Sequence, residues 1–463
     1  MGSAASLIER LSNIVGSERV RTDRDNLEEV CWDALSVGRI HPLKRPETAS
    51  PLCVVLPVSS AEVRQIILLA NEEKLPIVPY GGGSGLMGGA ITLRPGIVLD
   101  TRRMDRVLEV DKEACFVRAQ AGLVLEVLER RLSQEGLMLG HDPWTLPVAT
   151  VGGAISTNSL GYRGAKYGSM GDEVLGLEVV LPNGEILTTR AVPKSSTGIA
   201  LNYLFIGGEG CFGVITEATL RVFPRPERRS LNAVRFSSFE AGFLAIQNIY
   251  GLGLKPALMD FGDDAAKVKS GAILYLAFEG AKEVVEAEAR LALDLCEKEG
   301  GKKLAQEEAE EFWRDRHVIA RRFKQNRLQR RVGRSDGIRW EWVHVALPAS
   351  RVLDFRKAAM AILAARGIAL QESGLWTRPE LFSMRLAADE GGGERAQLVL
   401  EDTVEELLRL VQRMGGSMEY CHGVGVKLAP LMAEEHGYGL EVMRQIKTTL
   451  DPNNIMNPGK MAL

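Results

Sequence analysis

The chain has 463 residues, enough for two or three domains with cores of their own. Its 57 Lys and Arg nearly balance its 60 Asp and Glu, so no overall charge recruits nucleic acid or an anionic membrane. No apolar run approaches the roughly 20 residues of a membrane helix. The six cysteines contain no CxxC pair, which argues against a zinc site or a disulfide framework and predicts a cytoplasmic protein without a transmembrane segment.

The N-terminal segment, residues 1–48, is predicted to be helical, with Ser6 and Glu9 as a capping box that opens the helix LIERLSNIV. From residue 53 onward, short apolar strands alternate with amphipathic helices. This alternation predicts an α+β domain with many short strands over residues 49–226.

A glycine-rich stretch, PYGGGSGLMGGA, covers residues 79–90 and follows the apolar run LPIV. Six glycines in twelve positions predict backbone N–H groups that turn toward an anion such as a phosphate. Gly83, Gly85 and Gly88 spell the dinucleotide fingerprint GxGxxG, but Pro95 breaks any helix that could follow and GIVLD continues as a strand. We therefore expect a phosphate-binding loop and no nicotinamide-binding Rossmann site.

Two more glycine-rich tracts follow, over residues 141–168 and 205–227. Three such tracts in one domain predict one long ligand that lies across several loops. After Pro224 and Pro226 the pattern changes to longer strands and helices, which predicts a second domain over residues 227–414 with a sheet covered by helices.

The second domain contains a basic stretch, residues 321–334, with seven Lys or Arg in fourteen positions. It is predicted to be a solvated helix face, and the alternative is attraction to an anionic substrate or a membrane surface. The C-terminal segment, residues 415–463, is again rich in Gly, Pro and Asn and is predicted to return to the first domain.

The three tracts together resemble the FAD-linked oxidases of the vanillyl-alcohol oxidase type, from about residue 50 to the end. VPYGGGSGLMGG resembles the pyrophosphate loop, and DPWTLPVATVGGAISTNSLGYRGAKYG resembles the segment along the ribityl chain and the flavin ring. GGEGCFGVITEATL and DPNNIMNPGK are further marks of the family. The resemblance implies FAD as the cofactor, held by a two-subdomain FAD-binding domain beside a cap domain. The residues it implies for FAD binding are Pro79, Tyr80, Gly81, Gly82, Gly83, Ser84, Gly85, Leu86, Asp142, Pro143, Ala149, Thr150, Gly152, Gly153, Ser156, Asn158, Ser159, Glu209, Gly210, Val214, Ile215 and Asn457.

Two branches of the family are similar to this chain: the D-lactate, glycolate and D-2-hydroxyglutarate dehydrogenases, and alkyldihydroxyacetonephosphate synthase. FWRDRH and VALP resemble the first branch, in which an Arg at the position of Arg316 holds the substrate carboxylate. That branch also supplies metal ligands from a histidine motif, but residues 367–392 contain no histidine, so we expect no metal. The first glycine loop has no histidine either, which predicts non-covalent FAD.

His422 is the predicted catalytic base, because it lies in YCHGVG beside the titratable residues Tyr420 and Cys421. Arg316 is predicted to hold the substrate anion, and Tyr420 is a weaker catalytic candidate that could donate a proton or stack. His317 and His344 are second choices for lining the substrate cavity. His141, at the start of the second tract, is a candidate contact of the flavin ring.

The leading prediction is an FAD-dependent oxidoreductase that takes a hydride from the CH–OH carbon of a 2-hydroxy acid or related alcohol. Its partner is an anionic small-molecule substrate. The alternatives are a synthase-like alkyl transferase and a flavin-binding protein with a degenerate site. The sequence leaves open the electron acceptor, which is oxygen, a quinone or an electron-transfer protein, and also the formation of a homodimer.

Overall fold

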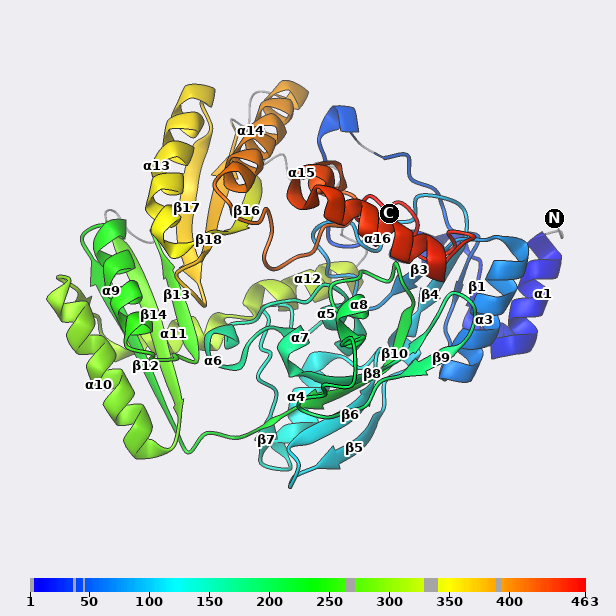
Figure 1. Ribbon diagram of the computed structural model, residues 1–463, viewed down its shortest axis with the longest axis horizontal. Coiled ribbons are helices and arrows are strands. Elements are labelled where there is room, and N and C mark those ends of the chain that lie inside the picture. The colour runs from blue at the N-terminus through cyan, green and yellow to red at the C-terminus, as the bar shows by residue number, and fades with distance from the viewer. Residues whose placement is uncertain (1–3, 36–38, 45, 264–270, 329–339, 389–392) are drawn as a thin grey trace.

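The computed structural model describes residues 4–35, 39–44, 46–263, 271–328, 340–388 and 393–463. Figure 1 shows that these residues form two lobes side by side. The first lobe holds a four-stranded and a five-stranded sheet, and the second holds a seven-stranded sheet. The last helices of the chain lie against the first lobe, so both the beginning and the end of the chain belong to that lobe (Figure 1).

The first sheet contains, in spatial order, β1 (Val20–Arg21), β2 (Cys53–Val55), β4 (Ile97–Asp100) and β3 (Ile77–Tyr80). Strands β2, β4 and β3 are parallel, and every residue of β2 and β4 is buried, as expected for parallel strands covered on both faces. Helix α3 (Ser60–Glu73) covers one face with Val63, Ile66 and Ile67. Its start is fixed by the side chain of Ser59, which accepts a hydrogen bond from the next turn.

The N-terminal segment forms α1 (Ala4–Val15) and α2 (Arg24–Val30) around strand β1. The predicted capping box at Ser6 is wrong, because α1 is already helical at Ala4 and Ser6 lies within its first turn. Leu7, Leu11 and Val15 of α1 pack against the first sheet. The segment therefore contributes a strand as well as helices.

The second sheet is antiparallel and contains β5 (Val107–Asp111), β6 (Phe116–Gln120), β10 (Val214–Arg221), β8 (Val174–Val180) and β9 (Ile186–Thr188) in this order. Helix α4 (Leu125–Ser133) buries Leu125, Leu128 and Leu132 in the same core as β6 and β10. The second glycine-rich tract forms the short helices α5 (Val151–Ser156) and α6 (Gly164–Tyr167), and the short helices α7 (Met170–Glu173) and α8 (Asn202–Phe205) lie between the second and third tracts, with α8 ending at the first residue of the third. The pair β7 (Leu137–Met138) and β11 (Phe223–Pro224) closes this lobe.

The second lobe is built on a sheet with the order β15 (Lys302–Lys303), β12 (Arg228–Phe236), β14 (Ala272–Gly280), β13 (Leu258–Gly262), β17 (Ala369–Trp376), β18 (Leu381–Ala387) and β16 (Trp340–Ala346). Alternation along β14 sends Leu274 and Leu276 to one face and Ile273 and Tyr275 to the other. The first face packs under α9 (Phe239–Gly251), α10 (Lys282–Lys298), α13 (Ala349–Arg366) and α14 (Gly393–Arg413). The second face packs against α11 (Gln306–Asp315).

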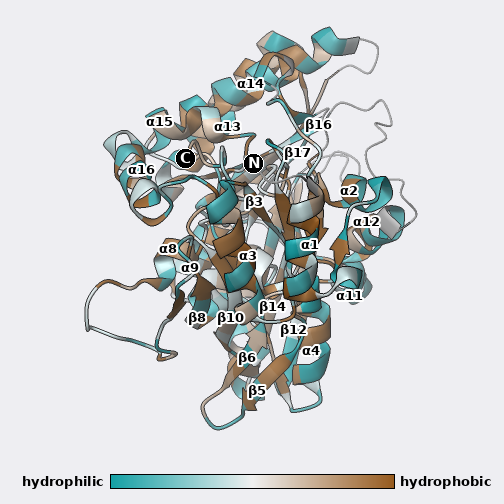
Figure 2. Ribbon diagram, turned by 90° about the vertical axis from the view of Figure 1, so that its right-hand side faces the viewer, coloured by the Kyte–Doolittle hydropathy of each residue, from teal (hydrophilic) through white to brown (hydrophobic). Residues whose placement is uncertain are grey.

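Hydrophobic colour in Figure 2 gathers on the strands in the middle of the molecule, while the outer helices are mixed. The basic stretch begins in α12 (Val318–Leu328), and its residues 329–334 lie outside the described residues. In the described part, Arg321 pairs with Glu126 at 2.9 Å and Lys324 donates to the carbonyl of Pro147 at 3.0 Å. This helix therefore contacts the first lobe.

The C-terminal segment forms α15 (Met432–His436) and α16 (Tyr438–Leu450) and then runs beside β3. The N–H of Ile77 donates to the carbonyl of Ile455 at 2.7 Å, and the N–H of Asn457 donates back to Ile77 at 2.8 Å. Lys460 is buried and donates to the carbonyl of Ile91 at 2.7 Å. These bonds attach the segment to the first lobe, and the predicted domain boundaries remain a prediction.

Candidate active site

A long pocket, with about 1210 Å³ of empty volume that is partly open to solvent, runs through the first lobe to the loop that carries His422. All three glycine-rich tracts contribute to its wall. The predicted FAD-binding residues that line it are Pro79, Tyr80, Gly81, Gly82, Gly83, Ser84, Gly85, Leu86, Pro143, Ala149, Thr150, Gly152, Gly153, Ser156, Ser159, Glu209, Gly210, Val214 and Ile215. The structure thus brings together residues that are more than a hundred positions apart in the sequence.

The first glycine loop packs directly on the second tract. A Cβ added to Gly81 would lie 2.4 Å from Oγ1 of Thr150, and one added to Gly82 would lie 2.4 Å from the carbonyl oxygen of Val148. Gly83 has φ +58°, a left-handed conformation that favours glycine. The glycines are therefore required for backbone contact between the two loops as well as for approach to a ligand.

The predicted residues Asn158 and Asn457 are not part of the pocket wall described above. The side chain of Asn158 accepts a hydrogen bond from the N–H of Gly171 at 3.0 Å. Asn457 is buried and its amide donates to the carbonyls of Gly89 at 2.8 Å and Glu209 at 2.6 Å. Both side chains hold the pocket loops together, and a direct contact with FAD stays a prediction for them.

Glu209 connects the third tract to the loop after His422. Its buried carboxylate accepts hydrogen bonds from the N–H groups of Val424 and Gly425. Burial raises the pKa of Glu209 to about 7, against the lowering effect of these two backbone donors. The carboxyl group thus ties the C-terminal segment to the pocket wall.

The loop of His422 is organised by Glu419. One carboxylate oxygen, Oε1, accepts from the N–H groups of Tyr420 at 3.0 Å, Cys421 at 2.7 Å and His422 at 3.0 Å. The same oxygen lies 3.5 Å from Nδ1 of His422, which makes an ion pair but no hydrogen bond. Glu419 was not singled out from the sequence, although its i, i+3 spacing to His422 was an available signal.

His422 and Cys421 line the same pocket as the glycine loops, although they lie more than two hundred positions further along the chain. Burial opposes the charged form of His422, but the adjacent Cys421 sulfur and the Glu419 carboxylate raise its pKa to about 10. The resting side chain is therefore an imidazolium at neutral pH. None of the pocket-lining residues in the described part of the chain is Lys or Arg, so His422 supplies positive charge there.

Tyr420 and His344 lie behind His422. The rings of His344 and His422 have centroids 4.6 Å apart, and Nδ1 of His344 is 3.4 Å from the hydroxyl of Tyr420. Burial and the charge of His422 lower the pKa of His344 to about 3, so it is neutral at physiological pH. Burial raises the pKa of Tyr420 well above its usual range, so its hydroxyl stays protonated.

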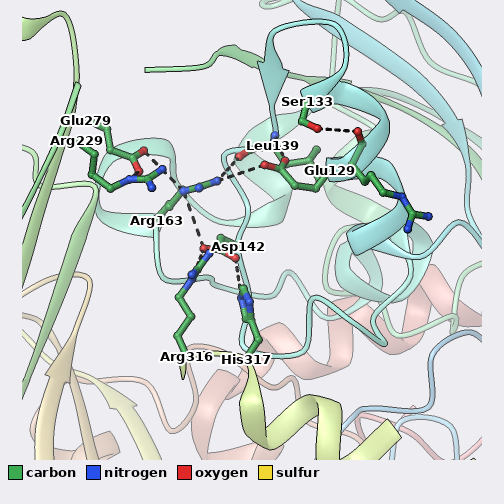
Figure 3. A network of polar contacts seen from close by, with 10 residues as sticks. Glu129, Ser133, Leu139, Asp142, Arg163, Arg229, Glu279, Arg316 and His317 are labelled. Atoms are coloured by element: carbon green, nitrogen blue, oxygen red, sulfur yellow. Dashed lines mark hydrogen bonds and ion pairs between the residues drawn. The ribbon is translucent and has the colours of Figure 1, made fainter. Parts of the chain in front are cut away.

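The predicted substrate ligand Arg316 lies elsewhere, in the polar network of Figure 3. Its Nε donates to Oδ2 of Asp142 at 3.0 Å, and its Nη1 donates to the carbonyl of Trp313 at 2.5 Å. His317 contacts the other oxygen of Asp142 at 2.9 Å. Although burial opposes its ionised form, Arg163, His317 and Arg316 hold the pKa of Asp142 well below its usual range.

Asp142, predicted to contact FAD, and the second-choice residue His317 are therefore partners of each other, and neither lines the pocket. His141, the other predicted flavin contact, is buried and bonds through Nε2 to Ser159 at 2.9 Å. Burial lowers the pKa of His141 to about 4. The role of Arg316 as a substrate ligand stays a prediction, and its contacts within the protein do not favour it.

Asp33 is a pocket residue that sequence reasoning missed. Its carboxylate accepts from the N–H groups of Leu35 at 3.0 Å and Ala90 at 3.3 Å, which anchors the end of the first glycine loop. Burial raises its pKa to about 6. No local pattern in the N-terminal segment indicates this contact, because it depends on how the segment folds back over the loop.

No group of three or more His, Cys, Asp or Glu side chains within the described ranges is arranged to hold a metal ion. The same ranges contain no helix with both the length and the apolar character needed to cross a membrane.

Two family models match the chain: an FAD binding domain over residues 51–190 and the C-terminal domain of FAD linked oxidases over residues 225–461. The chain is 32% identical to the D-lactate dehydrogenase of Archaeoglobus fulgidus over 445 residues, 93% of this chain and 95% of that protein. It is 30% identical to the glycolate oxidase subunit GlcD of Bacillus subtilis over 427 residues, 89% of each chain. A solved structure of alkyldihydroxyacetonephosphate synthase matches with a TM-score of 0.78 at 21% identity, covering 98% of this chain and 84% of that one.

The fold and the pocket define a flavoprotein oxidoreductase. The chain belongs to the FAD-linked oxidase family, as an FAD-dependent oxidase or dehydrogenase. The predicted family, the predicted α+β fold with an FAD-binding domain and a cap, and the predicted cofactor are confirmed. The residues present fit FAD, because all three glycine-rich tracts line one long pocket and Gly81 and Gly82 leave no room for a side chain where the first loop packs on the second tract.

Proposed function

We propose that the protein oxidises the CH–OH carbon of an anionic 2-hydroxy acid or a related alcohol, with His422 as the residue that handles the hydroxyl proton. The observation that carries this proposal is the placement of His422 on the pocket wall with Glu419 directly behind it. A related D-lactate dehydrogenase and a related glycolate oxidase subunit support the same class of substrate. FAD, when bound, supplies the acceptor for the hydride.

His422 has two tasks in this proposal. As an imidazolium it attracts the substrate carboxylate into a pocket whose other described titratable groups include the acidic Asp33 and Glu209. As a neutral imidazole it takes the hydroxyl proton while the carbon loses its hydride, so that a carbonyl forms and no charge is left on the product oxygen. Glu419 keeps the ring oriented and stabilises the imidazolium after the transfer.

Tyr420 is a hydrogen-bond donor in this proposal and does not exchange its proton. Its hydroxyl contacts His344 at 3.4 Å, and its raised pKa keeps it protonated. It therefore fixes the position of His344, which in turn packs against the ring of His422 at 4.6 Å. This order places Tyr420 behind the reacting atoms.

Anaerobic mixing of the FAD-loaded protein with a panel of D- and L-2-hydroxy acids tests the proposal. We expect one group of hydroxy acids to bleach the flavin absorbance in a saturable manner, and we expect acid to release the FAD. If no hydroxy acid or related alcohol bleaches the flavin, the proposed reaction is wrong. An exchange assay with an acylated and an alkylated substrate then decides between the synthase-like alkyl transferase and a degenerate flavin-binding site.

A further inference from the structure

A second pocket lies outside the flavin pocket, where α4 of the first lobe meets the connection before β12 and the end of α11. It has about 710 Å³ of empty volume and is open to solvent. Its wall contains five arginines and a tryptophan, namely Arg130, Arg163, Arg225, Arg229, Arg316 and Trp313. We call it the arginine crevice, and its inner part is drawn in Figure 3.

Three of these arginines have carboxylate partners inside the protein. Arg229 contacts Glu279 at 2.5 Å and Arg316 contacts Asp142 at 3.0 Å. Arg163 lies among these carboxylates and within 4.0 Å of Glu129. A fourth carboxylate on the wall, that of Glu126, is paired with Arg321 of α12. The inner part of the crevice is thus close to electrical balance, with three guanidinium groups and three carboxylates.

The remaining two arginines leave the crevice with surplus positive charge. Arg130 and Arg225 are exposed, and their side chains make no hydrogen bond or ion pair with any residue that the structure describes. They stand on separate elements, α4 and the connection to the second lobe, and both border the same opening. Once the internal ion pairs are counted, the net positive charge of the crevice is therefore that of these two guanidinium groups.

The inner wall also has an unused donor and is rigid. Arg163 is buried, and its Nε donates no hydrogen bond although Glu279 lies at 3.7 Å and Asp142 at 4.0 Å. Three guanidinium groups make cation–π contacts with the ring of Trp313. Their Cζ atoms lie 3.9 Å (Arg316), 4.5 Å (Arg229) and 5.6 Å (Arg163) from the ring centroid. Such stacking fixes the planes of the guanidinium groups, which reduces the ordering cost when an oxyanion binds.

We propose that the arginine crevice binds a small dianion, either a phosphate monoester or a dicarboxylate, at a site separate from the flavin. Two unpaired guanidinium groups match two negative charges, and planar guanidinium groups pair with both phosphate and carboxylate oxygens. Because the wall comes from both lobes, the bound dianion connects them and restricts their relative movement. Asp142 of this network directly precedes Pro143 of the flavin pocket, so the two sites are neighbours in the chain.

Calorimetric titration of the FAD-loaded full chain with inorganic phosphate, succinate and acetate tests the proposal, and the double variant described below separates binding at the crevice from binding beside His422. We expect saturable binding of phosphate or succinate with one site per chain, and at least tenfold weaker binding of the monoanion acetate. Binding of phosphate alone assigns the phosphate class, and binding of succinate alone assigns the dicarboxylate class.

The double variant Arg130→Gln, Arg225→Gln removes two exposed side chains without breaking an internal pair, so folding is preserved. We expect it to weaken dianion binding about tenfold or more, on the order of what charged hydrogen bonds contribute. The control is Arg351→Gln on α13, an exposed arginine outside the crevice, which should bind like the unmodified chain. Absence of saturable binding, equal affinity for acetate, or undiminished binding in the double variant would overturn the proposal.

Discussion

His422 and Arg316 are two basic side chains that the sequence places at the substrate, and the structure surrounds them differently. His422 lies on the wall of the flavin pocket, 3.5 Å from one oxygen of Glu419. Arg316 lies outside that wall and donates to Asp142 and to the carbonyl of Trp313. The imidazole faces the flavin pocket, whereas two donors of the guanidinium group are used within the protein, outside that pocket.

The comparison shows that a cation is available to a substrate only when nearby carboxylates leave it unsatisfied. Oε1 of Glu419 accepts hydrogen bonds from three backbone N–H groups. Glu419 therefore polarises His422 through its charge, without a hydrogen bond to the ring. The carboxylate of Asp142 instead uses one oxygen for Arg316 and the other for His317. Residue type alone therefore does not decide which basic group is functional.

The largest expected effect comes from removing His422. We expect His422→Gln to slow anaerobic flavin reduction by about 100-fold to 10,000-fold, the range of general-base catalysis. Glutamine keeps a polar group of similar size at the pocket wall, so FAD content should stay normal. Stopped-flow absorbance measures the reduction rate, and the absorbance of the purified protein measures bound FAD.

The matched control is His436→Gln, which changes an exposed histidine at the end of α15. This variant should reduce the flavin at the unmodified rate. If His422→Gln also keeps the unmodified rate, His422 is not the proton acceptor. The comparison with Arg316 then no longer contrasts a functional residue with a structural one.

The pH dependence of reduction is the next largest effect. The pKa of His422 is raised to about 10, and the neutral form must accept the proton, so the active fraction increases as pH rises toward that value. Below the pKa, the reduction rate at saturating substrate should increase about tenfold per pH unit. A reduction rate that does not change between pH 6 and pH 9 would show that the proton acceptor is a group that stays neutral over this range. His344, with a pKa of about 3, is then the candidate acceptor.

A smaller effect is expected from the first glycine loop. In Gly82→Ala the new Cβ lies 2.4 Å from the carbonyl oxygen of Val148, so backbone must move, at a cost of about 1 to 3 kcal/mol. We expect FAD affinity to fall about tenfold to a hundredfold. The control, Gly251→Ala at the end of α9, meets no atom within 4 Å and should keep its FAD. Full FAD content in both variants would show that the loop has room to adjust.

Much of the fold and of the flavin pocket was predictable, because local patterns carry it. The strands around β2, β3 and β4 are short apolar runs, and the glycine loop joins two of them in a way that sequence alone reveals. The cap elements β12, α9, β14 and α10 also belong to the predicted sheet covered by helices. In these regions, the pattern of apolar residues within about ten positions is enough to predict the type of element and which of its residues are buried.

The remaining part of the site depends on contacts between distant segments. Asp33 reaches Ala90 across 57 positions, and Asp142 reaches His317 across 175. Neither pairing has a local signal, because the first depends on how the N-terminal segment folds over the glycine loop and the second on how one lobe packs on the other. Glu419 was accessible in principle, three positions before His422, but its role appears only when its carboxylate is seen to accept three backbone N–H groups.

The smallest expected effect on catalysis comes from Arg316→Ala. Its Nε and Nη1 are already bonded to Asp142 and Trp313, so we expect substrate affinity to change less than tenfold. Stability should fall instead, by about 1 to 3 kcal/mol, since Asp142 is left buried with fewer partners. Arg316→Lys should restore only part of the lost stability, because an ammonium group cannot make the planar contacts of a guanidinium group. The control is Arg314→Ala, which removes an exposed neighbour. Thermal melts and substrate-dependent stopped-flow reduction separate the two outcomes: an unchanged melt with substrate affinity reduced tenfold or more would show that Arg316 holds the substrate anion after all.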